Sequence, residues 1–269
     1  MSLMRRVDEA RKAFRDKDRS GAAAAHSRER IAATALEEHG GAGDQYLGDM
    51  VYGGLDGIVT TFAVVSGVAG ADLGSHVVLI LGLANLFADG FSMATGAYLS
   101  TKSEQEYYAR EYEREAWEVD HFPDGERAEL VEVYRGRGYS ADDAGKLVEI
   151  QSKDRHRWVK AMMVDEVGML PDERRPVLSG LATVASFLVA GSLPLLVYLV
   201  GLAVPIPGEV SFPTSLGLSA VALFGLGAAK VFVTRRNAFR SGLEMLVVGS
   251  LAAAVAYLIG ALLKGIGGG

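Results

Sequence analysis

The sequence predicts an all-α protein with five transmembrane helices and a three-helix cytoplasmic module between crossings two and three. Three observations lead to this fold class. Apolar stretches of about 20 residues, enough for a helix to cross a bilayer, occur five times. Charged residues concentrate in residues 1–50 and 100–177, which leaves the other stretches only 5 basic and 5 acidic side chains. No proline or glycine occurs between Ala97 and Phe122, so one crossing can continue as a helix out of the membrane.

The predicted organisation has four segments. The first 20 residues alternate in charge and lack the apolar core of a secretory signal, so we expect a cytoplasmic arm there. We expect the crossings near residues 51–71, 77–99, 178–202, 215–234 and 243–263. The complete division is an N-terminal arm at 1–45, transmembrane helices 1–2 at 46–99, an acidic module at 100–177 and transmembrane helices 3–5 at 178–269.

Lysine and arginine predict the orientation, because they are in excess in cytoplasmic loops. The connection at 235–240 contains three arginines, whereas those at 72–76 and 203–214 contain no lysine or arginine. We therefore expect the N-terminus and residues 100–177 in the cytosol. The Ala-, Gly- and Arg-rich composition favours a multi-pass protein of a bacterial plasma membrane.

Charge and composition exclude several classes of function. A net charge of −6 without a basic face disfavours a nucleic-acid partner. The chain has no cysteine, which excludes disulfides, thiolate metal sites and thiol catalysis. Glycine and alanine are dense in the crossings, where they let helices approach closely. This pattern is compatible with a homodimer.

Residues 100–177 are predicted to form three helices. The first is a stalk that continues the second crossing and stops at Pro123. About 20 residues beyond the membrane, at 1.5 Å each, would make this stalk about 30 Å long. A second helix is expected near 124–136, and a third near 140–168, with Ser140 in a capping-box pattern.

Polar groups within the crossings are costly in hydrocarbon and are therefore treated as functional. The first crossing contains Asp56 among glycines. The second contains Asn85, Asp89 and Met93 at four-residue spacing, which places them on one helix face. Desolvation favours the protonated form of a carboxyl group, whereas a bound cation favours the ionised form. These opposed effects are a physical basis for exchanging a metal ion for protons, with helix capping and packing as the alternative roles.

Glutamates recur on one face of the stalk and on both following helices. Such like charges repel unless a cation lies among them, either Arg110, Arg114 or a metal ion. Carboxylates alone suit Mg²⁺, Ca²⁺ or Mn²⁺, and thioether sulfur shifts the preference toward Fe²⁺ and its neighbours. A solvated charged face is the alternative interpretation. The residues in this pattern are Glu104, Glu111, Glu115 and Glu118 of the stalk, Glu126 and Glu129 of the second helix, and Met162, Met163 and Glu166 of the third.

One motif favours a different class of protein. Residues Glu118 to His121 form a Glu-x-x-His, the pattern that di-iron helix bundles use. Those proteins need two such motifs, and only one occurs here. A membrane-anchored iron-oxidising enzyme, or an iron-binding and storage protein without transport, is therefore the alternative hypothesis.

Motif strings in the first two crossings and the module carry a family resemblance. They read DGIVTTFA from Asp56, GLAN from Gly82, Ser92-Met93, Tyr98-Leu99, Lys102-Ser103-Glu104 and Met162-Met163-Val164-Asp165-Glu166. On these residues the chain, from about residue 46 to its C-terminus, resembles the vacuolar iron transporter family.

The resemblance implies a dimer with an ion path between the protomers, which exports Fe²⁺, and often Mn²⁺, from the cytosol in exchange for protons. It implies that Asp56 and Met93 line the path and that Asp49 lies at its entrance. The resemblance also implies that the module collects the metal, through Glu115, Glu118, Glu126, Glu129, Met162, Met163 and Glu166. Neither an organic cofactor nor an enzymatic reaction is implied.

The chain departs from the family pattern at Asn85, where some members carry glutamate. Asp89, one turn further on, is our candidate to compensate. Carboxylate and thioether ligands admit Fe²⁺, Mn²⁺, Co²⁺ and Zn²⁺, so the preferred metal stays open. The sequence thus predicts a homodimeric metal/proton antiporter of the lipid bilayer, a secondary transporter. Its predicted transport path is Asp49, Asp56, Asn85, Asp89 and Met93.

Overall fold

The computed structural model describes residues 3–29, 31, 44–204, 206–229 and 237–264. All regular structure in these ranges is helical, as predicted. Two units are described separately, residues 1–48 and residues 49–269. The side chains of residues 3–8, 11 and 44 lie outside the description.

The first unit contains two packed helices, α1 (Leu3–Asp16) and α2 (Arg19–Ala25). Lys17 has a φ of 51°, a left-handed conformation that ends α1 and turns the chain. The carboxylate of Asp18 then accepts a hydrogen bond from the Ser20 amide at 2.9 Å and caps α2. Ala13 and Ala25 are buried in this unit.

Within the described ranges, five helices are long and apolar enough to cross a membrane, which confirms the predicted number. They are α4 (Leu47–Gly70), α5 (Ser75–His121), α9 with α10 (Pro176–Gly191 and Leu196–Val200), α11 (Gly208–Ala229) and α13 (Ala238–Leu263). The start of α11 differs from the sequence prediction of 215, because Pro213 is accommodated inside the helix instead of preceding it. The predicted end of this crossing, at 230–234, lies outside the described residues.

Small residues let these helices pack against one another within the chain. A Cβ added at Gly57 of α4 would collide with the carbonyl of Phe187 in α9. A Cβ at Gly53, one turn earlier, would lie 2.5 Å from the carbonyl oxygen of Thr183. The glycines on either side of Asp56 therefore set the approach of α4 to α9.

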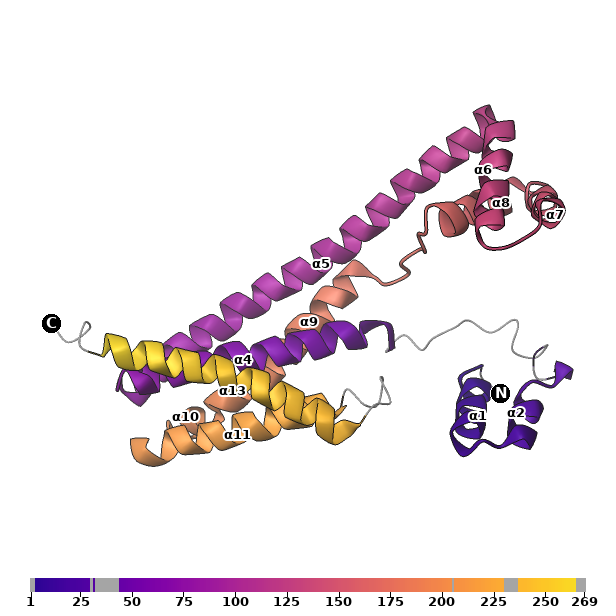
Figure 1. Ribbon diagram of the computed structural model, residues 1–269. Helices are drawn as coiled ribbons and strands as arrows, with labels where there is room; N and C mark the ends of the chain where they lie inside the picture. The colour runs from indigo at the N-terminus through magenta and orange to yellow at the C-terminus, as the bar shows by residue number, and fades with distance from the viewer. Residues whose placement is uncertain (1–2, 30, 32–43, 205, 230–236, 265–269) are drawn as a thin grey trace. The chain divides into compact units, whose positions relative to one another are not determined.

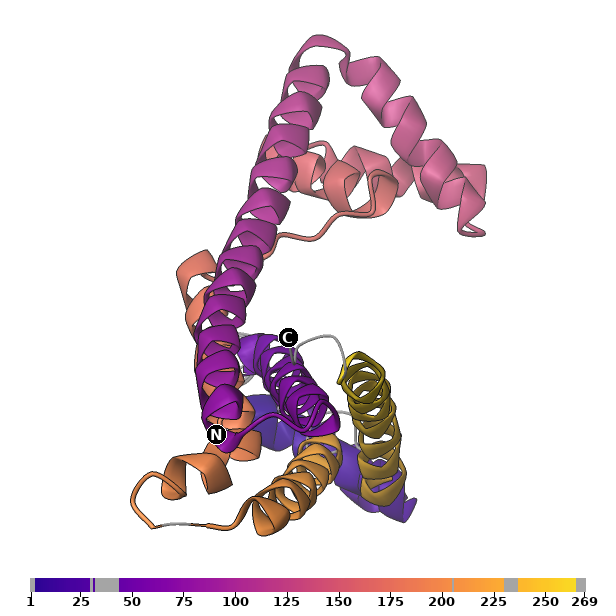
Figure 2. The ribbon, with the colours of Figure 1, turned by 90° about the vertical axis from the view of Figure 1, so that its left-hand side faces the viewer.

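The 47 residues of α5 form one helix that continues past the other apolar helices as the predicted stalk (Figures 1 and 2). At its far end the chain turns back through α6 (Pro123–Gly136), α7 (Ala141–Gln151), α8 (Arg155–Ala161) and the π-helical turn η2 (Met162–Glu166). We call residues 100–177 the charged module. Its buried core includes Leu130, Tyr134, Trp158, Met162 and Met163.

The third predicted module helix is divided in the structure. Ser140 caps α7, as expected, by accepting a hydrogen bond from the Asp143 amide at 3.1 Å. The helix stops after Gln151, however, and Asp154 caps a new helix by accepting from the Arg157 amide at 2.7 Å. Prediction of one continuous helix over 140–168 was therefore wrong, because a second cap competes locally with helix continuation.

Candidate metal pathway

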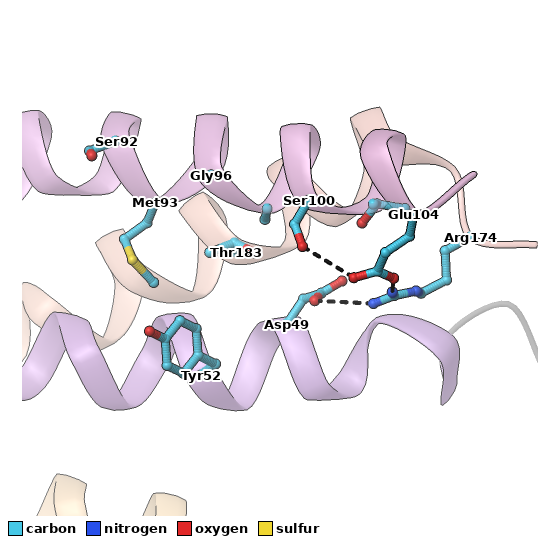
Figure 3. A pocket seen from close by; sticks show the side chains of 11 residues that line it. Asp49, Tyr52, Ser92, Met93, Gly96, Ser100, Glu104, Arg174 and Thr183 are labelled. Atoms are coloured by element: carbon cyan, nitrogen blue, oxygen red, sulfur yellow. Dashed lines mark hydrogen bonds and ion pairs between the residues drawn. The ribbon is translucent and has the colours of Figure 1, made fainter. Parts of the chain in front are cut away.

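A polar cavity of about 500 Å³ lies between α4 and α5, close to α9 (Figure 3). It brings together two carboxylates, a thioether, several hydroxyl groups and a guanidinium. The lining residues are Asp49 and Tyr52 of α4, Ser92, Met93, Gly96, Ala97, Ser100, Thr101 and Glu104 of α5, Arg174 of the segment before α9, and Thr183 of α9.

Two of the five residues predicted for the transport path, Asp49 and Met93, line this cavity. Figure 3 shows Met93 projecting from α5, and Asp49 and Tyr52 from α4, into the same space. Asp49 is largely buried, with 18 % of its side chain exposed, and its Oδ2 has no hydrogen-bond partner among the described residues. Asp49 and Met93 thus bring a carboxylate and a polarisable sulfur to the lining of one cavity.

The other three predicted path residues lie outside this lining. Asp56 follows Asp49 by two helical turns, which is about 10 Å along α4. It is half-buried, and so is Asp89 of α5. Asn85 is half-buried too, and its Nδ2 has no hydrogen-bond partner among the described residues. These three residues supply polar groups further along the apolar helices.

Arg174 lies at the opening of the cavity and was not predicted from the sequence. Its guanidinium contacts Asp49 Oδ1 at 3.6 Å, Glu104 Oε2 at 3.2 Å and Asp172 Oδ2 at 2.7 Å. Glu104 is 70 residues away in sequence, so no local spacing could reveal this contact. The hydrogen bonds from Arg174 hold the pKa of Asp172 below its usual range.

In the charged module, glutamate carboxylates gather in two groups that share Glu126. Within each group the oxygens lie no more than 4.8 Å apart. Sequence analysis predicted all five members as ligands, and the fold brings them together from the stalk, α6 and η2. The groups are Glu115, Glu118 and Glu126, and Glu126, Glu129 and Glu166.

Arg114 is the cation expected among the stalk glutamates. Its guanidinium lies 3.0 Å from Glu111, 2.5 Å from Glu115 and 2.5 Å from Glu118. The prediction that a cation separates these like charges is confirmed. Because Glu115 is only 1 % exposed, its pairing with Arg114 also offsets the loss of water around the carboxylate.

Three carboxyl groups of the module are shifted toward the protonated form, and burial is the first cause for Glu115, whose pKa is raised in spite of its pairing with Arg114. Burial, followed by repulsion from Glu115, raises the pKa of Glu126 to about 7. The same two causes raise the pKa of Glu166 to about 7, with a hydrogen bond to Glu129 adding to them. Glu126 Oε2 is buried and has no hydrogen-bond partner among the described residues. Glu126 and Glu166 would both release a proton on binding a cation at neutral pH.

The predicted methionine ligands are placed differently from the glutamates. Met162 and Met163 are fully buried in the module core, beside Trp158 and Leu130. They belong to the π-helical turn that also carries Glu166 to the second acidic group. A π-helical turn is an unusual local structure that frequently marks functional sites.

Arg137 and Tyr134 hold this turn from α6 and its C-terminal end. Arg137 donates from Nη1 to Asp165 Oδ1 at 2.5 Å and from Nη2 to the Asp165 carbonyl at 2.9 Å. The Tyr134 hydroxyl lies 2.8 Å from Asp165 Oδ2. Burial and the hydrogen bond to Asp165 raise the pKa of Tyr134 to about 12. The neighbour of Glu166 is thus fixed by three contacts.

His121 of the Glu-x-x-His motif belongs to neither acidic group. Its Nδ1 donates to the Trp117 carbonyl at 2.7 Å, and its ring stacks on Trp117 with centroids 4.3 Å apart. Through these contacts, His121 packs against Trp117 at the end of the stalk.

Comparison with known proteins identifies the family. The sequence pattern of the VIT family matches residues 47–261. A vacuolar iron transporter of Toxoplasma gondii is 36 % identical, over 97 % of this chain and 89 % of its own length. Vacuolar iron transporter 1 of Oryza sativa subsp. japonica is 34 % identical over 78 % of this chain and 82 % of its own. Vacuolar iron transporter 1 of Arabidopsis thaliana is 32 % identical over 83 % and 88 %. The resemblance found in the motif strings is confirmed, and this chain belongs to the VIT family.

Proposed function

We propose that this protein exports Fe²⁺ from the cytosol by proton antiport, with Mn²⁺ as a second substrate. It would act as a homodimer in the lipid bilayer, with the N-terminus and the charged module in the cytosol. Relatives over most of the chain are named vacuolar iron transporters, and the five apolar helices suit a multi-pass membrane protein. The proposed membrane is a bacterial plasma membrane.

The cavity lined by Asp49 and Met93 is the observation that carries this proposal. A carboxylate and a thioether together favour a softer divalent ion over Ca²⁺ or Mg²⁺. Asp49 Oδ2 has no hydrogen-bond partner among the described residues, so a small rotation of the carboxylate would offer it to an incoming ion. Tyr52 and the hydroxyl groups of Ser100 and Thr101 offer further oxygen ligands around the same space.

Proton coupling is proposed for the next stage of the path, at Asp56 and Asp89. A carboxyl group away from bulk water favours its protonated form, and a bound cation favours the ionised form. A bound Fe²⁺ would therefore displace protons from these carboxyl groups, and protons arriving from the opposite side would favour release of the ion. Asn85, which carries no charge, would assist as a neutral oxygen ligand.

The charged module is proposed to collect the ion before transport. Its glutamates lie close enough for two or more of them to bind one ion, and Glu126 and Glu166 would release protons on doing so. Such a cluster raises the local cation concentration near the path. Met162 and Met163 would join as ligands only if η2 rearranges, because both are fully buried.

The test is metal flux into proteoliposomes with an imposed pH gradient, with Fe²⁺ kept reduced and Mn²⁺ in parallel. The variants are Asp56→Ala and a control, Asp72→Ala, which removes a carboxylate that pairs with Lys264 and is 74 % exposed. We expect gradient-driven flux in the wild type and the control, and none in Asp56→Ala. Full flux in Asp56→Ala would refute the proposed path.

A storage protein is distinguished by the same experiment. It would bind the ions in detergent but carry no gradient-driven flux in the wild type. An iron-oxidising enzyme would instead consume oxygen when Fe²⁺ is added.

A further inference from the structure

The guanidinium of Arg174 occupies the opening of the cavity where the proposed path begins. It touches carboxylates from three separate parts of the chain: Asp49 of α4, Glu104 of α5 and Asp172 beside it (Figure 3 shows the first two). The side chain is 29 % exposed, so it reaches solvent on one side and the cavity on the other.

The three carboxylates hold the Arg174 guanidinium with different strength. Asp172 holds the guanidinium by hydrogen bonds from Nε at 3.0 and 3.1 Å and from Nη2 at 2.7 Å. Glu104 accepts a further hydrogen bond at 3.2 Å. Asp49, in contrast, is 3.6 Å away, which is an ion pair without a hydrogen bond. Arg174 can therefore leave Asp49 while Asp172 still holds it.

The backbone around Arg174 is fixed independently of its side chain. Gln105 of α5 donates from Nε2 to the Asp172 carbonyl at 3.0 Å and to the Arg174 carbonyl at 2.5 Å. The segment before α9 is thus attached to the stalk by its main chain. A movement of the guanidinium needs only side-chain rotation.

We propose that Arg174 competes with the incoming metal ion for Asp49. While the cavity is empty, the guanidinium supplies the positive charge that this half-buried carboxylate needs. A divalent ion binding at Asp49 would be repelled by it, so the guanidinium turns toward Glu104 and Asp172 when the ion enters. Competition of this kind weakens binding at the opening and helps the ion to move onward. The inference rests on the proposed function, in which Asp49 lies on the path.

The absence of cysteine allows a direct test of the charge. In Arg174→Cys, the single thiol is modified with 2-aminoethyl methanethiosulfonate, which restores a positive charge, or with 2-hydroxyethyl methanethiosulfonate, which gives a neutral side chain of similar size. Both adducts come from one folded preparation. The measurement is the Mn²⁺ concentration that gives half-maximal flux in proteoliposomes.

We expect the neutral adduct, like Arg174→Gln, to need about threefold to tenfold less Mn²⁺ for half-maximal flux than the cationic adduct. The control Lys102→Gln removes a positive charge two residues from Glu104 on α5, where Lys102 pairs with Glu106 at 3.6 Å, and should leave this concentration unchanged. Equal values for the two adducts would overturn the inference. So would an equal loss of maximal flux in both, which indicates a structural role alone.

A second measurement distinguishes failure of the proposed function from failure of this inference. If the wild type carries no gradient-driven flux, the transport proposal fails, and the two adducts are then titrated with Mn²⁺ in detergent. Tighter binding by the neutral adduct supports competition at Asp49. Identical titrations overturn it.

Discussion

Arg137 and Asp165 are joined twice, from Nη1 to the carboxylate at 2.5 Å and from Nη2 to the main-chain carbonyl at 2.9 Å. The second contact is a hydrogen bond to the backbone of the π-helical turn, at the residue before Glu166. A side chain that holds the main chain in this way determines where the next residue points. The position of Glu166 in the second acidic group therefore depends on an arginine that binds no metal itself.

Arg137→Gln should weaken Mn²⁺ binding by the charged module about threefold to tenfold, because the metal site would lose only part of the about 1.5–3 kcal/mol that charge-assisted hydrogen bonds contribute. Binding is measured by titration of the full chain in detergent. The matched control is Arg135→Gln, which removes a surface pair with Glu132 on the same helix. Equal weakening in both variants would contradict a specific role for Arg137.

The raised pKa values of Glu126 and Glu166, both about 7, predict how stability depends on pH. Between about 4.5 and 7 the folded module binds more protons than the unfolded chain. Its free energy of unfolding should therefore fall as the pH rises through this range, in the absence of metal. Glu126→Gln should flatten this dependence, because the amide does not titrate.

Both tryptophans of the chain, Trp117 and Trp158, belong to the charged module, so intrinsic fluorescence reports its unfolding in the full-length protein. Thermal unfolding is followed from pH 5 to pH 8 with a chelator present. Glu149→Gln, which changes an exposed pair with Lys153, is the control and should keep the wild-type slope. A wild-type slope in Glu126→Gln would refute the assignment.

Arg114→Gln should destabilise the metal-free module by about 1–3 kcal/mol, because it leaves the buried Glu115 without its counter-ion. Added Mn²⁺ should then stabilise the variant more than the wild type, since the ion replaces the missing charge. Unfolding with and without Mn²⁺ measures both effects. The control is Arg110→Gln, which removes an ion pair with Glu111 at 3.8 Å. It should neither destabilise the metal-free module nor increase the stabilisation by Mn²⁺.

Gly57→Ala should destabilise the packing of α4 against α9 by about 1–3 kcal/mol, because the added Cβ meets the Phe187 carbonyl. The control lies on the same helix: a Cβ at Gly67 is 3.5 Å from the nearest oxygen, that of Ala256. Gly67→Ala should thus be tolerated. The two variants are compared by their thermal stability in detergent. An equal loss of stability in both would contradict the prediction, because the contact with the Phe187 carbonyl would then not be its cause.

Much of the fold could be predicted because its causes are local. Apolar length defines five helices, Ser140 caps α7 as its spacing predicts, and Arg114 lies among glutamates three and four residues away. The break before Asp154 was missed because an Asp side chain can either cap a new helix or lie within a continuing one. The two alternatives are close in free energy, and the sequence does not distinguish them. Pro213 inside α11 was missed for a similar reason.

The candidate site was harder to predict, because its geometry depends on contacts between distant segments. The module glutamates were identifiable by their type and spacing, but the sharing of Glu126 by two groups requires α6 to fold back on the stalk. No sequence pattern pointed to Arg174. Its partner Glu104 is 70 residues away in the chain, and Asp49 is more than a hundred residues away. Only the folded chain reveals that a cation stands at the cavity opening.

The uninterrupted course of α5 has an electrostatic consequence. Glu104 at the cavity and Glu115 in the module lie on one helix, eleven residues and about 16 Å apart along its axis. The Debye length at physiological ionic strength is about 8 Å, so solution salt screens the two positions from each other. Under the proposed function, an ion released by Glu115 would therefore cross the gap as a hydrated, freely diffusing cation, and would not be passed directly from one carboxylate to the next. In dilute buffer, where the screening length grows to about 30 Å, the module and the cavity would attract ions as one field.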